Sequence, residues 1–504
     1  MELDVERLSA DRLEADLCIV GAGPAGIALA REFMPDGISV LLLESGGPSP
    51  EIWPQTLNQG TVTGVSYAGL RNTRHRQTGG TTYLWNTPVA GRQGAKYVPL
   101  DPWDLEDWPI TWEELVSYYH RAQQVAGLGP FRYDGAAWAG TTDQAVIGPG
   151  EEHLVTRIYQ FGGREAVVGN LQMIRAATDV RLCHHATVCQ LSTSSDRARV
   201  TGARIRIRSG REIRVHASRF ILASGAIENA RLLMVSEIGS RLDLVGRCFM
   251  EHPRDQTMTL FPDGPDAFER LAFYDQHLTP GGTIIGGRLG PTEQAVREFH
   301  LTSFSATLLP QRRELPPAPG LGARLSRRIR ALVTPPPAGG YGWSRGSDHR
   351  RWFEGFRMLL NLEQRPHREN RLVLEGGTDL LGVPRVGLHW TWRPEEQAAL
   401  ERLKSLLVDW CAHAGLGRVR LDPNVAPDPN AHHHAGTTRM SRDPRDGVVD
   451  PDGRVHGVEN LFVTGASVFP TAGFANPTLT VLALAIRLAD HLRDAGPRSA
   501  LPRP

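Results

Sequence analysis

The sequence predicts a mixed α/β (α+β) fold, in which a Rossmann-like dinucleotide-binding domain is interrupted along the chain by a second domain built on a sheet. A strand, a glycine-rich loop, a helix and a second strand follow one another near the start, and an apolar helix lies near the end. The chain has 504 residues, 40% of them hydrophobic, which is enough for one large core and a second, smaller one.

The overall composition argues against several classes of protein. Lys and Arg number 56 and Asp and Glu 55, whereas a nucleic-acid binder usually has a concentrated basic surface. The first 16 residues are acidic and polar, unlike a secretory signal, and no apolar run reaches the roughly 18 residues needed to cross a bilayer. We therefore expect a cytoplasmic protein without a membrane span or a nucleic-acid partner. The five cysteines form no CxxC pair, which predicts reduced, mostly buried thiols.

The first motif is a glycine-rich loop between two apolar runs. Residues 17–20 are followed by Gly21-Ala-Gly23-Pro-Ala-Gly26, a helical segment at 27–34 and a second run at 38–43 that ends at Glu44. Gly21 permits a tight turn, Gly23 lets the backbone approach a pyrophosphate, and Gly26 lets the helix pack closely on the strand. The helix N-terminus attracts phosphates, and Glu44 can accept hydrogen bonds from a ribose. The alternative is a glycine-rich turn in an unrelated α/β fold.

A second fingerprint of this quality is absent from the sequence. Gly79-Gly80-Thr81-Thr82 does not follow a clear strand, and the strand at 220–224 lacks the later glycines. A flavoprotein that also used NAD(P)H would be expected to have one. We therefore expect a single dinucleotide, which receives its hydride directly from the substrate.

The last helix has clear start signals. Asn476 suits the N-cap and Pro477 the first helical position, where its missing N–H costs nothing. The segment that follows is apolar on nearly all sides to about Leu492, which predicts a buried helix. Its N-terminus would bring about half a positive charge into the interior, which would stabilise an anionic reduced flavin.

Several motifs together resemble the glucose–methanol–choline (GMC) oxidoreductase family. They are the opening loop with Glu44, Gly79-Gly80, Trp108-Pro109-Ile110, residues 224–233, Glu251-His252-Pro253, Glu369-Asn370-Arg371, HxxGTxRM from His433 to Met440, and NPTLT from Asn476 to Thr480. The resemblance implies FAD as cofactor and a GMC / p-hydroxybenzoate-hydroxylase-like architecture. Gly465 stands where many choline-dehydrogenase-like members have Asp, a feature similar to the pyranose oxidase branch and to bacterial glycoside 3-oxidases.

The same resemblance assigns the cofactor contacts. Together with the loop and the helix start, it predicts that FAD is bound by Gly21, Gly23, Ala25, Gly26, Glu44, Gly79, Gly80, Thr81, Trp85, Asn86, Val188, Ser224, Gly465, Ala466, Asn476, Pro477 and Thr478. Fungal pyranose oxidases attach FAD covalently through a His shortly after the GG loop, and Leu84 takes that place here. Because leucine cannot form the bond, we expect non-covalent FAD.

Family members use a His–His or His–Asn pair facing the flavin, which here corresponds to His433 and Asn476. An imidazole titrates near neutral pH and can take the hydroxyl proton, while the amide holds the substrate oxygen. The triplet 432–434 could instead bind a metal, but in an extended chain its side chains would alternate between faces, so we expect no metal. His432 and His434 then either support the catalytic pair or only fill space in the interior. His252 either holds a loop in place or takes part directly in catalysis.

The motifs divide the chain into two discontinuous parts. Residues 1–100, 175–260 and 440–504 contain the nucleotide motifs, and residues 101–174 and 261–439 would build the substrate domain. An insertion rich in Pro, Gly and Arg at about 310–346 contains a short basic helix at 323–332. A lid over the site, a plain surface insertion, and docking to a membrane surface or partner are its three interpretations.

These features predict FAD-dependent oxidation of a secondary alcohol of a sugar or glycoside to a ketone. The partners are a small-molecule alcohol substrate and oxygen or a quinone-type electron acceptor. One alternative is oxidation of a primary alcohol on an aminoglycoside or another biosynthetic intermediate. Another is a flavin-binding module that has lost catalysis, against which the intact His433–Asn476 pair argues.

Overall fold

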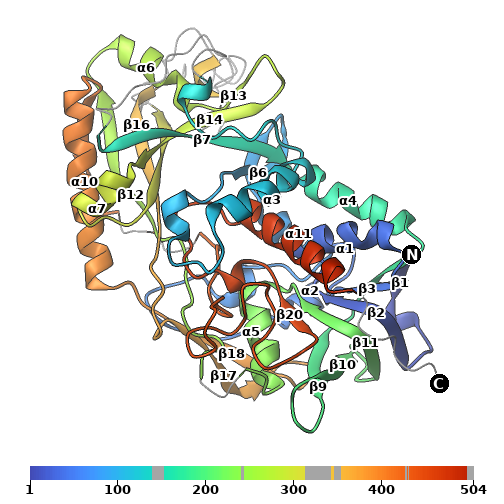
Figure 1. The fold of residues 1–504 in the computed structure, drawn as a ribbon. Coiled ribbons are helices and arrows are strands. Elements are labelled where there is room, and N and C mark those ends of the chain that lie inside the picture. The colour runs from blue at the N-terminus through green and yellow to red at the C-terminus, as the bar shows by residue number, and fades with distance from the viewer. Residues whose placement is uncertain are drawn as a thin grey trace, which may run out of the picture.

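The computed structural model describes residues 1–138, 152–239, 243–312, 342–345, 353–425, 428 and 431–496. Two large sheets lie in opposite halves of the molecule, with helices packed between and around them (Figure 1). No helix in these residues is long and apolar enough to cross a membrane. The predicted basic helix at 323–332, and most of the insertion around it, lies outside the described residues.

The first sheet is the nucleotide-binding half. Its path runs β1 (Glu2–Asp4), β8 (Val180–His184), β3 (Val40–Leu43), β2 (Arg12–Val20), β11 (Glu212–Leu222), β10 (Val200–Arg206) and β9 (Val188–Thr193), with β20 (Leu461–Val463) also beside β11. The pairings from β1 to β11 and that of β20 are parallel, whereas β9, β10 and β11 pair antiparallel. The predicted strand at 17–20 is confirmed, and it is the buried end of the longer β2.

Helices cover this sheet and connect it to the second half. They are α1 (Pro24–Phe33), α3 (Trp112–Val125), α4 (Arg164–Ala176), α5 (Gly225–Val235) and α11 (Thr478–Asp494). Figure 1 shows α1, α3 and α11 side by side between the two sheets. Pro24 occupies the first turn of α1, where its fixed φ suits a helix start, so the helix begins three residues earlier than predicted.

The second sheet is antiparallel. Its path runs β19 (Gly417–Leu421), β12 (Arg254–Pro262), β16 (Phe353–Leu362), β15 (Phe304–Arg312), β14 (Ile284–Pro291), β7 (Leu154–Gly163), β6 (Arg92–Tyr97) and β5 (Thr87–Val89), with β13 (His277–Leu278) beside β14. Helices α6 (Pro265–Leu271), α7 (Glu293–Glu298) and α10 (Pro394–His413) lie around it. Its side chains form a second hydrophobic core, as the chain length predicted.

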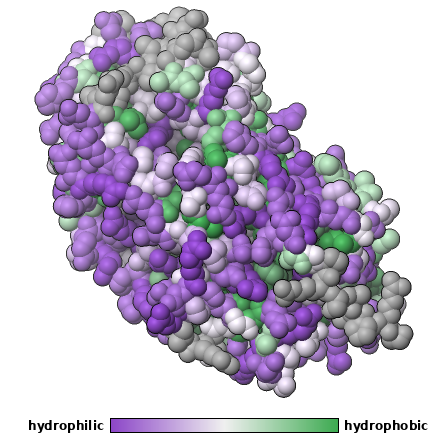
Figure 2. Space-filling view, in the orientation of Figure 1, coloured by the Kyte–Doolittle hydropathy of each residue, from purple (hydrophilic) through white to green (hydrophobic). Residues whose placement is uncertain are grey.

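Smaller elements complete the fold. A three-stranded sheet consists of β17 (Arg371–Thr378), β18 (Pro384–Trp390) and β4 (Val62–Gly64), and α2 (Ile52–Thr56) is a short helix. All five cysteines are free, and all but Cys248 are buried, which confirms the predicted reduced thiols. Hydrophilic residues predominate on the face in Figure 2, where the hydrophobic patches are small and separate.

The order of strands can be compared with the proposed division into two domains, which stays a proposal. The first sheet takes its strands from 2–43, 180–222 and 461–463, whereas the second takes most of its strands from 154–163 and 254–421. Strands β5 and β6, at 87–97, also join the second sheet, although they fall within the proposed first segment of the nucleotide domain.

A side chain at Gly26 would clash with the glycine loop. A Cβ there would lie 1.9 Å from the carbonyl oxygen of Gly21, so α1 would have to move off the loop. We expect Gly26→Ala to lower the thermal unfolding midpoint, because overpacking costs about 1–3 kcal/mol. Gly169→Ala in α4 is the matched control, since its Cβ would meet no described atom within 4 Å. Equal midpoints for the two variants would contradict this account of the packing.

Candidate active site

The glycine loop after β2 has the geometry that its sequence predicts. Gly21 has a φ of +108°, and a Cβ there would lie 2.7 Å from the carbonyl oxygen of Ala223. A Cβ on Gly23 would meet no described atom within 4 Å, so the backbone is open at that point. The loop is therefore tight where it turns, and it is open where a pyrophosphate would approach the start of α1.

Glu44 ends β3 beside this loop. Its carboxylate accepts hydrogen bonds from the backbone N–H groups of Ala22 (3.1 Å) and Gly46 (2.9 Å). Burial raises the pKa of Glu44, while these two donors and Arg76 favour its charged form. The acid thus fixes the loop, and each oxygen keeps acceptor capacity for a ribose hydroxyl.

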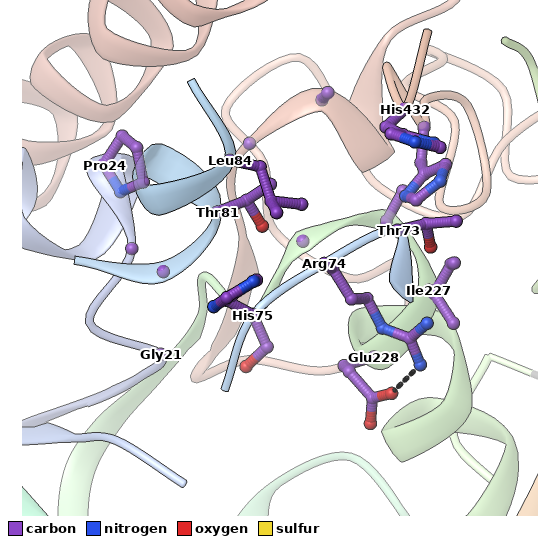
Figure 3. A pocket seen from close by; sticks show the side chains of 18 of the residues that line it. Gly21, Pro24, Thr73, Arg74, His75, Thr81, Leu84, Ile227, Glu228 and His432 are labelled. Atoms are coloured by element: carbon purple, nitrogen blue, oxygen red, sulfur yellow. Dashed lines mark hydrogen bonds and ion pairs between the residues drawn. The ribbon is translucent and has the colours of Figure 1, made fainter. Parts of the chain in front are cut away.

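A cavity of about 750 Å³ extends from the loop to the start of α11 (Figure 3). The predicted residues that line it are Gly21, Gly23, Ala25, Glu44, Gly80, Thr81, Trp85, Asn86, Val188, Ser224, His433, Gly465, Ala466, Asn476, Pro477 and Thr478. Gly26 and Gly79 are not among the lining residues. Gly26 packs against Gly21, and the N–H of Gly79 donates to the carbonyl oxygen of Ala22 (2.8 Å), so both shape the loop from behind.

His433 and Asn476 meet in this cavity, although they are far apart in sequence. The amide nitrogen of Asn476 lies 3.1 Å from His433 Nε2, and His433 Nδ1 lies 2.8 Å from His252 Nδ1. Because the amide nitrogen can only donate, Nε2 accepts and is unprotonated. Nδ1 of His433 then donates its hydrogen to His252.

The predicted cap of the last helix is wrong by one residue. Helix α11 begins at Thr478, and Pro477 occupies the cap position with helical dihedral angles. The carbonyl oxygen of Pro477 accepts the first helical bond, from the N–H of Val481 (2.9 Å). Asn476 is left outside the helix, and its side chain bonds to His433 instead of capping.

Both imidazoles are neutral at pH 7. Burial is the largest cause that lowers the pKa of His433 well below 6.5, and His252, Lys96 and Arg254 lower it further. Burial likewise lowers the pKa of His252 to about 4, although the backbone of Ala472 and Gly473 favours its charged form. His433 is therefore present as the free base.

Glu251 holds the two histidines in place. Its carboxylate accepts hydrogen bonds from the backbone N–H groups of His433 (2.7 Å) and His252 (2.9 Å), and from the Tyr67 hydroxyl (2.5 Å). Burial raises the pKa of Glu251 to about 7. The sequence placed Glu251 in a family motif but indicated no role for it, because its partners lie in distant segments.

The histidine triplet divides between two surroundings, as the alternation argument predicted. His433 faces Asn476, whereas Glu251, His432 and His434 have possible ligand atoms within 4.8 Å of one another. The Tyr67 hydroxyl already bonds to Glu251 and to His434 Nε2 (2.8 Å). This hydrogen-bonded arrangement favours the interpretation of His434 as a supporting residue, and the absence of a metal stays a prediction.

A buried ion network lines the other end of the cavity and was not predicted. Glu228 on α5 pairs with Arg74 (2.7 Å), Arg76 (2.6 Å) and Arg231 (3.4 Å), and Figure 3 shows the first pair. Although burial opposes ionisation, these cations hold the pKa of Glu228 well below its usual range. Glu228 was visible only within a family motif, and isolated arginines in a loop give no sequence signal.

The residues present fit FAD. The backbone is open at Gly23 and Gly465, where an added Cβ would meet no described atom, and the start of α11 faces the cavity. Asn476 Oδ1 is buried and has no hydrogen-bond partner among the described residues. The cavity thus offers a nucleotide-binding loop at one end and an unpaired acceptor beside an unprotonated imidazole at the other.

Comparison with known families agrees with this assignment. Residues 14–120 match the family model of an FAD binding domain, and residues 366–485 match that of a GMC oxidoreductase. Two solved structures share the fold over nearly the whole chain. Pyridoxine 4-oxidase from Mesorbium loti has a TM-score of 0.60 at 18% identity (95% of this chain, 99% of that one), and formate oxidase has 0.61 at 17% (97% and 99%).

Curated relatives act on several kinds of alcohol. The fructose dehydrogenase large subunit of Gluconobacter japonicus is 24% identical over 96% of this chain and 99% of its own length. Paromamine 6'-oxidase of Streptomyces fradiae is 26% identical over 94% and 90%. C-glycoside 3-oxidase of Microbacterium trichothecenolyticum is 37% identical, over 24% of this chain and 23% of its own.

The attachment of FAD can be tested directly. Leu84 lines the cavity, and the family resemblance puts it where a tethering His would be expected. Leucine has no nucleophilic atom. We expect acid precipitation to release all the flavin into the supernatant, measured by absorbance and by mass spectrometry of the polypeptide. Flavin that stays with the precipitated chain would contradict the prediction.

Proposed function

We propose that this chain, which belongs to the GMC oxidoreductase family and uses FAD to oxidise alcohols, converts a secondary hydroxyl of a sugar or glycoside to a ketone. The observation that carries the proposal is the His433–Asn476 pair in the FAD-sized cavity, with Nε2 of His433 unprotonated. Removing the hydroxyl proton requires a base that touches the oxygen, and His433 is such a base in the described cavity.

When bound, FAD supplies the acceptor for the hydride. The hydroxyl proton would go to His433 Nε2, and the hydrogen on the same carbon would leave with the electron pair of the C–H bond, as a hydride for the flavin, so a ketone remains. The resulting imidazolium keeps both N–H groups bonded, since Nδ1 donates to His252 Nδ1 and Nε2 to the product oxygen. Asn476 holds the same oxygen through its amide without competing for the proton.

His252 would stabilise His433 after the proton transfer. His252 accepts from His433 Nδ1 and remains neutral, because burial lowers its pKa to about 4. It can therefore stabilise the cationic His433 through a charge-assisted hydrogen bond without adding a second positive charge. Glu251, which bonds to the backbone of both residues, keeps the two rings at that distance.

The base assignment predicts the behaviour of His433→Ala. Because general base catalysis contributes roughly 10²- to 10⁴-fold, flavin reduction by the best alcohol should slow by about that factor while bound flavin is retained. The measurement is anaerobic stopped-flow bleaching of the flavin. His413→Ala, on the exposed C-terminal turn of α10, is the matched control and should reduce at the parent rate. A barely slowed His433 variant would overturn the assignment.

The substrate class has two candidate forms. The similarity to C-glycoside 3-oxidase, at 37% identity over a quarter of the chain, supports a secondary ring hydroxyl. The similarity to paromamine 6'-oxidase over nearly the whole chain supports the alternative of a primary alcohol on an aminoglycoside. A catalytically inactive flavin-binding module is disfavoured by the pair of His433 and Asn476.

A substrate panel separates these candidates. We expect monosaccharides or glycosides to bleach the flavin anaerobically faster than aminoglycosides, and the product to be a ketone by mass spectrometry and NMR. Reoxidation with oxygen or with a quinone then identifies the electron acceptor. Faster bleaching by aminoglycosides with an aldehyde product would favour the alternative, and no bleaching by any alcohol would favour the inactive module.

A further inference from the structure

We propose that the substrate carries a carboxylate, which is bound by Lys96 on the sheet side of the active-site cavity. This inference rests on the proposed function, because it names the chemical class of alcohol that the same site would take. It predicts an acidic sugar derivative, or a glycoside with an acidic aglycone, in preference to a neutral glycoside.

The register of the second sheet places Lys96, which lines the cavity, on the same face as Arg288, which is buried and does not line it. Lys96 on β6 pairs with Phe161 on β7, and Arg288 on β14 pairs with Arg157 on β7. Since alternate residues of a strand share a face, Lys96 and Arg288 project on the same side as Tyr159. Lys96 Nζ and Arg288 Cζ each lie 5.8 Å from the centre of the Tyr159 ring.

The same face continues to the catalytic histidine. Arg254 at the start of β12 pairs with Asn361 on β16, and both line the cavity together with Lys96. Lys96 and Arg254 are close enough to His433 to lower its pKa. A group bound at Lys96 therefore lies within the same cavity as the reacting hydroxyl.

Neither Lys96 nor Arg288 has an acidic partner among the described residues. The Lys96 ammonium lies against the Tyr159 ring, and it forms no ion pair with a described acid. Arg288 is 1% exposed and donates to the carbonyl oxygens of Tyr274 (2.9 Å) and Gly287, while its Nε and Nη2 have no described acceptor. Buried charge that the protein does not pair is costly, and an anionic ligand would offset that cost.

The acids of the cavity lie elsewhere. The described acidic residues that line it are Glu44, Glu228 and Asp379. Glu44 bonds to the glycine loop, and Glu228 and Asp379 pair with the arginine network at Arg231. The nucleotide end is thus internally neutralised. At the sheet end, Arg254 pairs with Asp428, whereas Lys96 forms no ion pair with a described acid.

The chain uses lysine at only two positions, Lys96 and Lys404, and relies on arginine elsewhere. Lys404 pairs with the buried Asp255 (3.2 Å), so it is neutralised within the protein. Burial, followed by Arg288 and Arg254, lowers the pKa of Lys96 to about 7. A bound carboxylate would restore the protonated amine, which matches the chemistry of an anion subsite.

Benzoate and its neutral isostere benzamide test the subsite without turnover. Each is titrated into the FAD-loaded protein, and binding is followed by the change in the flavin absorption spectrum. We expect benzoate to bind more tightly than benzamide, and Lys96→Met to abolish this preference by weakening benzoate about ten- to hundred-fold. Lys96→Arg, which keeps the charge, should retain the preference, and Arg418→Met, at a side chain 91% exposed, should match the parent.

Two outcomes would overturn the proposal: equal binding of the two probes, and a benzoate preference that survives in Lys96→Met. In the second case, a shifted flavin midpoint potential of Lys96→Met would assign the charge to the cofactor. Flavin content and the thermal midpoint of each variant show that it is folded.

A matched pair of alcohols then separates this inference from the proposed function. Methyl β-glucopyranoside and methyl β-glucopyranosiduronate differ only in the carboxylate at C6. We expect the uronide to reduce the flavin at lower concentration, and Lys96→Met to remove that advantage. If neutral glycosides reduce the flavin and benzoate binds no more tightly than benzamide, only the anion subsite is contradicted. If benzoate binds through Lys96 but no glycoside reduces the flavin, the proposed function fails alone.

Discussion

The position of one imidazole depends on contacts from two distant parts of the chain. His433 is held by Glu251 through its backbone N–H, by His252 through Nδ1 and by Asn476 through Nε2. The contact with Asn476 leaves Nε2 as an acceptor, and burial keeps it unprotonated at neutral pH. The segment at 251–252, just before β12, and the loop before α11 must therefore meet for the site to exist.

The cavity between the sheets is electrostatically divided. At the nucleotide end, each acid is bonded to a backbone N–H or paired with an arginine, as with Glu44 at the loop and Glu228 at Arg74 and Arg76. At the sheet end, Lys96 and the buried Arg288 lie against the same Tyr159 ring, and neither forms an ion pair with a described acid. The charges at the nucleotide end are therefore already paired within the protein. The other end favours a ligand that carries a negative charge.

Local sequence predicted those features that depend on neighbours in the chain. The glycine loop, the buried strand before it and the apolar last helix were all predictable, because each follows from steric limits or periodicity within a short window. Asn476 shows where this reasoning ends. Its sequence context favours a helix cap, but the contact with His433 from a segment 43 residues away places it outside the helix.

The glycine loop and its flanking runs predicted a bound dinucleotide and the open backbone at Gly23, since these depend on chemistry within one short segment. The resemblance of several motifs to one family implied FAD and His433 as the candidate base. Only the tertiary structure decided which ring nitrogen is free, which acid supports the histidines and where unpaired cations gather. Those properties arise from burial and from contacts between strands far apart in sequence, such as Lys96 on β6 and Arg288 on β14. A single segment contains neither the low-polarity surroundings that shift the pKa of a buried side chain nor the acid that would pair with a buried cation.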